Sequence, residues 1–367
     1  MSDLTQGSSQ PDSISVDDSG ARLRAFIKPI VIVLILAIIL SLLTLDYYNI
    51  LQVEDPNFTP PDISPIPENP EDPGGIAWGA FLNMLYYVLI AFIGGIIVLF
   101  IIKKGFMRFL IYFFALLMGF SWFTFGLFYG SIISYLSISL IWEFLPYFLQ
   151  QTINNVYIPI LYLFAILIAI LGVISFGIQT FDKIWLRNTM MIFFGAMIGS
   201  LFALHLPLLT AFLILIGLSL YDIYAVFRGP LKGIIDHGRK TAGEVEELSS
   251  IEGNQDVVYE PVPLFPALPV YSTPLINIGL GDFAFFSMLV SVAVVIGISL
   301  ASPFPLVLSL IGLFIGVLYT FKLLQKERAL PGLPLPIFGG ISCLILGVVL
   351  SWVLGLTDLS TIVGLFV

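Results

Sequence analysis

The sequence predicts an all-α membrane protein, a bundle of nine transmembrane helices with its amino terminus in the cytoplasm and its carboxyl terminus outside. Of the 367 residues, 58% are hydrophobic and 11% are charged, whereas charged residues make up about 25% of a typical soluble domain. The apolar residues gather in runs of about 20, the length that a helix needs to cross a bilayer. Lysines and arginines lie before the first run, near the ends of the runs or between them, and positive charge prefers the cytoplasmic side.

The apolar runs divide the chain into four parts. Residues 1–25 are polar and acidic, and we expect them to form a disordered tail. Residues 26–227 contain six expected spans, at 26–45, 77–102, 106–129, 157–179, 188–205 and 207–227. Residues 228–273 form an acidic loop that this orientation places in the cytoplasm. Residues 274–367 contain the last three expected spans, at 275–298, 303–324 and 333–356.

The stretch 131–150 is also apolar, but it carries Trp142, Glu143 and Pro146. This composition predicts an interfacial or re-entrant piece, with a tenth span as the alternative. The basic residues favour the first interpretation. With nine spans every lysine and arginine falls on one side of the membrane, whereas a tenth span would move the later basic clusters to the other side.

The remaining composition argues against several classes of function. The net charge of −9 comes from acidic residues in the tail and loops, which are expected to be solvated. No basic stripe exists, so we expect no nucleic-acid partner. The single cysteine, Cys343, excludes a disulfide within the chain, and His205 and His237 lie too far apart in the sequence to suggest a metal site. We therefore expect neither a metal nor an organic cofactor.

Two aspartates lie inside apolar spans. Asp222 stands in the sixth span and Asp282 near the start of the seventh. A carboxylate at the centre of a membrane helix costs about 2.5–3.5 kcal/mol on insertion scales, so such residues usually have a function. Asp222 lies six residues before Arg228, and Asp282 lies eight residues after Pro274, which are depths of roughly 9 Å and 12 Å from the cytoplasmic ends of the helices. Neighbouring antiparallel helices would bring the two side chains face to face.

A pair of carboxyls in a place of low dielectric has a particular chemistry. The two groups cannot both ionise easily, so they share a proton over a wide pH range. Aspartic proteolysis requires this state, because the ionised member takes a proton from water while the protonated member polarises the scissile carbonyl. Gly279 and Gly281 fit the same chemistry, since neither has a side chain to keep a substrate backbone away from Asp282.

Three short motifs resemble those of presenilin and signal peptide peptidase, the GxGD intramembrane aspartyl proteases. They are Tyr221-Asp222 in one span, Gly279-Leu280-Gly281-Asp282 at the next, and Pro331-Gly332-Leu333-Pro334 opening the last span. The resemblance implies that Asp222 and Asp282 are catalytic. It further implies substrate contacts for Tyr221, Gly279, Leu280, Gly281, Pro331, Gly332 and Leu333. The predicted orientation matches presenilin rather than signal peptide peptidase, whose topology is inverted, and an archaeal presenilin-like homologue is similar in size.

One motif departs from the family pattern. The family has Pro-Ala-Leu where this chain has Gly332 in the middle, a small change that should preserve an unwound segment facing the substrate. A literal Pro-Ala-Leu-Pro occurs at 266–269, before the seventh span, where a proline-rich extended loop is the simpler interpretation. Prolines at 331, 334 and 336 are expected to prevent a regular helix there and to leave some carbonyls free to pair with substrate.

The predicted function is hydrolysis of peptide bonds within transmembrane helices of membrane proteins or signal-peptide remnants, by a multi-pass protein of the cell membrane. The expected partners are transmembrane-helix proteins or peptides and the lipid bilayer. The sequence specifies neither an oligomeric state nor cleavage of the 228–272 loop. Two alternatives stay open: a proton-coupled transporter that uses the same carboxylates as a relay, and an inactive homologue that only binds membrane helices.

Overall fold

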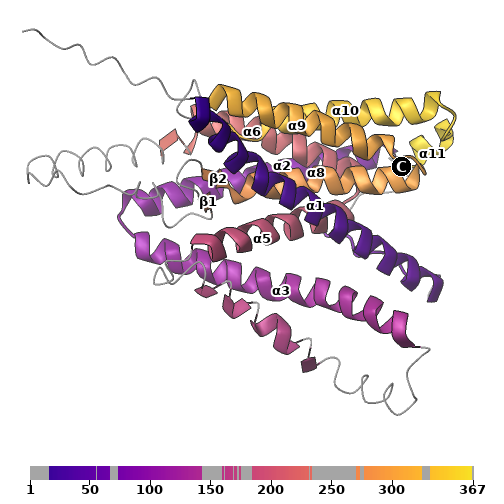
Figure 1. The fold of residues 1–367 in the computed structure, drawn as a ribbon, viewed down its shortest axis with the longest axis horizontal. Helices are drawn as coiled ribbons and strands as arrows, with labels where there is room; N and C mark the ends of the chain where they lie inside the picture. Colours follow the sequence, from indigo (N-terminus) through magenta and orange to yellow (C-terminus); the bar gives the residue numbers. More distant parts are fainter. Residues whose placement is uncertain are drawn as a thin grey trace, which may run out of the picture.

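The computed structural model describes residues 16–54, 56–66, 73–142, 184–230, 232–233, 270–272, 277–324 and 331–365, together with most of 159–174. It is an all-α membrane protein, as predicted (Figure 1). Within these residues, eight helices are long and apolar enough to cross a membrane. They are α1 (Val16–Glu54), α2 (Pro73–Lys103), α3 (Met107–Trp142), α5 (Ile184–His205), α6 (Leu208–Phe227), α8 (Leu280–Ser299), α9 (Phe304–Leu324) and α10 (Pro334–Val353).

Three short elements complete the described fold. Strands β1 (Val270–Ser272) and β2 (Asn277–Gly279) form an antiparallel hairpin directly before α8, and α11 (Leu359–Gly364) follows α10. The hairpin lies at the opposite end of the bundle from the carboxyl terminus (Figure 1). The predicted span at 157–179 is described only in part, as helical residues between 159 and 174, so nine spans and their orientation stay predictions.

Helix α8 forms the centre of the bundle. It packs against α1, α5 and α9 and also touches α6 and α10. Most of its side chains are buried, and Phe283, Leu289 and Ile296 have no exposed surface. Apart from Asp282, its sequence has no charged residue and is apolar all round, which is the pattern of a helix enclosed by others. Asp282 therefore begins a helix that its neighbours hold in place.

Glycines bring the helices around α8 into close contact. A side chain at Gly195 or Gly199 of α5 would collide with α8, at Phe283 and Ser287 respectively. Gly312 of α9 in the same way meets the α10 backbone at Gly339. Small side chains at these positions let the membrane helices approach closely.

The loop at 56–66 is tied to three helices at the end of the bundle away from the hairpin. The side chain of Asn83 on α2 pairs with both backbone groups of Ile66, at 2.9 Å each. The N–H of Ile63 donates to the carbonyl oxygen of His205 at 3.0 Å. Nε2 of His205 is 2.6 Å from the hydroxyl of Tyr48 on α1, and Nδ1 is 2.9 Å from the carbonyl oxygen of Leu201. Because a carbonyl only accepts, the ring hydrogen is assigned to Nδ1 and Tyr48 donates to Nε2.

Several element boundaries, and the conformation around the last prolines, differ from the sequence prediction. Helix α1 begins at Val16, inside the expected tail, because residues 21–25 are good helix formers (Ala, Arg and Leu). Residues 131–142 continue α3 without a break, so this part of 131–150 is not a separate re-entrant piece. Residues 277–279 are a strand and not the start of the seventh span. Finally, α10 begins at Pro334 and includes Pro336, because the first turn of a helix needs no N–H from proline.

Candidate active site

The two aspartates lie at helix positions that the local sequence defines. Asp222 is in the last turns of α6, five residues before its end at Phe227. Asp282 is in the first turn of α8, where Gly279 is the N-cap with extended backbone angles of φ −67° and ψ 145°. A carboxylate in a first turn is stabilised by the unpaired N–H groups there. Both side chains are half-buried.

The backbone that leads into α10 contacts both carboxyls. The N–H of Leu333 donates to Oδ2 of Asp222 at 3.2 Å. A Cβ atom built on Gly332 would lie 3.0 Å from Oδ2 and 3.1 Å from Oδ1 of Asp282. Two successive residues of one segment thus touch the acidic groups of two different helices. The two carboxyls are also close enough for their charges to interact.

Extended backbone enters the site on the side of Asp282. In the hairpin, Val270 pairs with Gly279 and Tyr271 with Ile278. The ring of Tyr271 packs edge-on against Phe283, the residue after Asp282, with centroids 5.7 Å apart, and burial raises the pKa of its hydroxyl. The β2 strand ends at Gly279, and a Cβ there would lie 3.6 Å from Oδ2 of Asp282. The hairpin therefore places strand backbone next to one carboxyl.

The predicted substrate-contact residues divide into three groups. Gly332 and Leu333 lie against the carboxyls, as does Gly279. Pro331 precedes this pair and is half-buried, while Leu280 opens α8 and Gly281 is exposed beside it. Tyr221 points elsewhere. Its hydroxyl donates to the carbonyl oxygen of Ala91 on α2 at 3.2 Å. The Pro-Ala-Leu-Pro segment at 266–269 lies outside the described residues.

Two parts of the site had no clear signal in the sequence. The first is the hairpin, whose strands are three residues each and are too short for an alternating pattern to stand out. The second is the contact of Tyr221 with α2. Helix α2 is apolar on every face, so its sequence does not show which residues meet α6.

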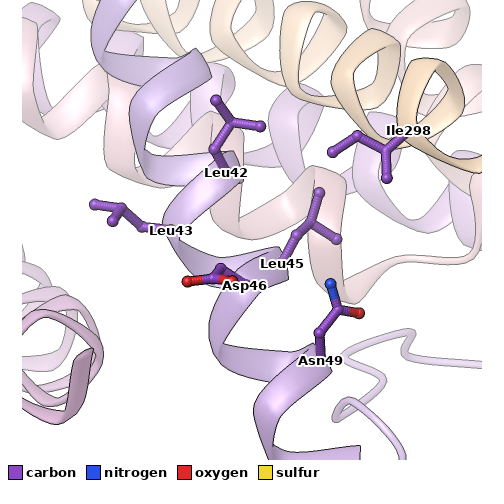
Figure 2. Close-up of a pocket in the computed structure, with 6 residues that line it drawn as sticks. All are labelled: Leu42, Leu43, Leu45, Asp46, Asn49 and Ile298. Atoms are coloured by element: carbon purple, nitrogen blue, oxygen red, sulfur yellow. The ribbon is translucent and has the colours of Figure 1, made fainter. Parts of the chain in front are cut away.

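A separate groove lies far from the aspartates. It has a volume of about 390 Å³ and lies between α1 and the end of α8 (Figure 2), where it is lined by Leu42, Leu43, Leu45, Asp46, Asn49 and Ile298. Ile298 is 16 residues from Asp282 along α8, which is roughly 24 Å of helix. The groove is thus no part of the site. Among the described residues, no three His, Cys, Asp or Glu side chains gather closely enough to hold a metal ion.

Comparison with known proteins gives matches along most of the chain. The Presenilin family model matches residues 17–248, and a model described as "Signal-peptide peptidase, presenilin aspartyl protease" matches residues 233–353. Asp222 falls in the first match and Asp282 in the second. Presenilin-B of Dictyostelium discoideum is 32% identical over 212 residues, which are 53% of this chain and 37% of that protein. The chain therefore spans well under half of this relative.

Proposed function

Because this chain belongs to the presenilin family, we propose that it is an intramembrane aspartyl endopeptidase whose catalytic groups are Asp222 and Asp282. The family consists of multi-pass membrane proteases, and the eight described membrane helices agree with that class. The observation that carries the proposal is the meeting of both carboxyls at Gly332 and Leu333.

The reaction needs one water molecule and one proton shared by the two carboxyls. The ionised carboxyl removes a proton from the water, whose oxygen attacks the carbonyl carbon of the scissile peptide bond. The protonated carboxyl meanwhile donates a hydrogen bond to the carbonyl oxygen. The tetrahedral intermediate then collapses, the C–N bond breaks, and the leaving nitrogen takes up a proton from the pair. Water enters and no other reactant is consumed, so a carboxylic acid and an amine are the products.

The substrate class follows from the backbone around the carboxyls. A transmembrane helix hides its peptide bonds in its own hydrogen bonds, so it must unwind before water can attack, and its freed N–H and C=O groups then need partners. The β1–β2 hairpin supplies strand backbone next to Asp282, and an unwound substrate segment can pair with such a strand. This supports transmembrane helices or signal-peptide remnants as substrates, and the same proposal places the reaction in the cell membrane.

A cleavage assay tests the proposal. The protein is purified in detergent and incubated with a labelled transmembrane peptide. Asp222→Ala and Asp282→Ala should each reduce cleavage to background, because neither carboxyl can carry out both proton transfers alone. Asp46→Ala is the matched control, since Asp46 is also an aspartate on a membrane helix but lines the remote groove. Cleavage that survives either substitution of Asp222 or Asp282 would refute the proposal.

The same preparation distinguishes the two alternatives. Family membership does not favour a proton-coupled transporter. A transporter would show proton-driven solute uptake in liposomes that depends on Asp282, with no proteolysis. An inactive homologue would bind the peptide without cleaving it, and binding would survive loss of both carboxyls.

A further inference from the structure

Helix α6 reaches α2 through the residue that precedes Asp222. The two helices lie side by side (Figure 1). The hydroxyl of Tyr221 donates to the carbonyl oxygen of Ala91 at 3.2 Å, and its ring meets Phe92 edge-on with centroids 6.4 Å apart. One turn earlier on the same face of α6, a Cβ atom on Gly217 would lie 2.6 Å from Cγ of Met84 on α2. This face of α6 therefore fits closely against α2 over two turns.

Gly95 makes the contact of Tyr221 possible. A Cβ atom on Gly95 would lie 3.1 Å from the Tyr221 hydroxyl oxygen and 3.3 Å from Cβ of Pro230, which follows α6. Gly95 stands four residues after Ala91, so a side chain at 95 would sit over the carbonyl that Tyr221 uses. The preceding residue, Gly94, has nothing within 4 Å of its Cβ position. Of these two glycines, only Gly95 lies against α6 and the residues that follow it.

Helix geometry links this contact to the site. Successive residues of an α-helix point about 100° apart, so the direction in which Tyr221 is held determines the direction of Asp222. A side chain reaches about 6 Å from the helix axis. A rotation of α6 by about 10° would thus move the Asp222 carboxyl by about 1 Å, and a misplacement of about 1 Å can reduce a rate about 100-fold.

We propose that Tyr221 is a positioning residue for Asp222. Its hydroxyl bonds to the α2 backbone, in the space left by the missing side chain of Gly95. The proposal rests on the proposed function, since it assumes that Asp222 takes part in the reaction. It gives α2 a role in the reaction. Few α2 side chains are buried, and the contact of α2 with α6 would transmit the position of α2 to the Asp222 carboxyl.

Two substitutions of different kinds test the proposal, each in the full-length protein with the same labelled peptide. Tyr221→Phe removes the hydroxyl and keeps the ring against Phe92. Gly95→Ala keeps the tyrosine at position 221 but adds a methyl group next to its hydroxyl. Each should lower kcat about 10- to 100-fold while KM stays within about twofold. Gly94→Ala is the matched control and should leave kcat unchanged, because its added methyl group meets nothing.

The outcomes separate this proposal from its alternatives. A rise in KM with kcat unchanged would mean that Tyr221 binds substrate and does not position Asp222. Wild-type kcat in both Tyr221→Phe and Gly95→Ala would overturn the proposal, as would equal losses in Gly95→Ala and Gly94→Ala. If kcat falls only in those variants whose melting temperature also falls, Tyr221 has a structural role only. Undiminished cleavage by Asp222→Ala would instead refute the proposed function itself, whatever the Tyr221 variants do.

Discussion

At the scale of single residues, the site depends on a missing side chain at position 332. Gly332 lets the backbone before α10 lie directly on the Asp282 carboxyl, while the next N–H bonds to Asp222. A residue with a Cβ would press on one carboxyl and leave the other bond in place. The distance between the two carboxyls is thus sensitive to the residue at this position, where the presenilin family has alanine.

Gly332→Ala should therefore displace the Asp282 carboxyl by a few tenths of an ångström, because its Cβ would lie 3.0 to 3.2 Å from three carboxyl atoms. We expect kcat to fall about three- to tenfold with little change in thermal stability, since the end of a side chain can move aside. Gly332→Val should lower kcat further. Peptide cleavage by the three proteins checks this series, and an unchanged kcat in both variants would show that the contact does not matter.

At the scale of elements, two short non-helical segments complete the site that the helices form. The hairpin places an extended strand at Gly279, and the segment at 331–333 carries the N–H that Asp222 accepts. Both are short and lie next to helix starts, where backbone groups have no partners within the helix. Helices α6 and α8 carry the two carboxyls, and the two non-helical segments contact these carboxyls from outside the helices.

The 56–66 loop gives an element-scale prediction of stability. Asn83→Ala removes both hydrogen bonds to Ile66 and leaves that residue's N–H and C=O without their partner. The loss should lower the free energy of unfolding by about 1–3 kcal/mol. Thermal unfolding in detergent measures it, with Asn49→Ala as the control because Asn49 is exposed on α1. Equal melting temperatures for the two variants would contradict the assigned role of Asn83.

Most of the helices and several site residues could be predicted from the sequence, and each success or failure has a physical reason. Hydropathy located the described spans to within a few residues at most ends, because only helices satisfy their backbone in lipid. The sequence also predicted the two aspartates and the Gly332-Leu333 segment as site residues. The structure places them in contact, and their roles in the reaction stay predictions. The hairpin was missed, since three-residue strands leave no period to read. The expectation that the prolines at 334 and 336 prevent a regular helix was wrong, because proline is tolerated in the first turn of a helix.

At the scale of the whole molecule, the predicted orientation decides which side of the membrane the carboxyls face. If positive charge lies inside, the turn after α2 is cytoplasmic and the 56–66 loop is outside. Asp222 and Asp282 then lie in the cytoplasmic half, near the ends of α6 and α8. This arrangement would release one product toward the cytoplasm.

Cysteine labelling checks the orientation. In a Cys343→Ala background, Thr59→Cys and Lys104→Cys each place a single thiol at an exposed position, one in each loop. A thiol reagent that cannot cross membranes, added to intact cells, should label Thr59→Cys and should reach Lys104→Cys only after the cells are permeabilised. The reverse pattern would mean an inverted topology, like that of signal peptide peptidase.

The most direct test of the central claim is a structure of the protein in a lipid nanodisc with a peptide analogue whose hydroxyl mimics the tetrahedral intermediate. Transition-state analogues bind more tightly than substrates when an enzyme has this chemistry. The account predicts that the hydroxyl lies within hydrogen-bond distance, about 2.6–3.2 Å, of both Asp222 and Asp282. An analogue that inhibits cleavage while it touches only one of these carboxyls, or neither, would contradict it.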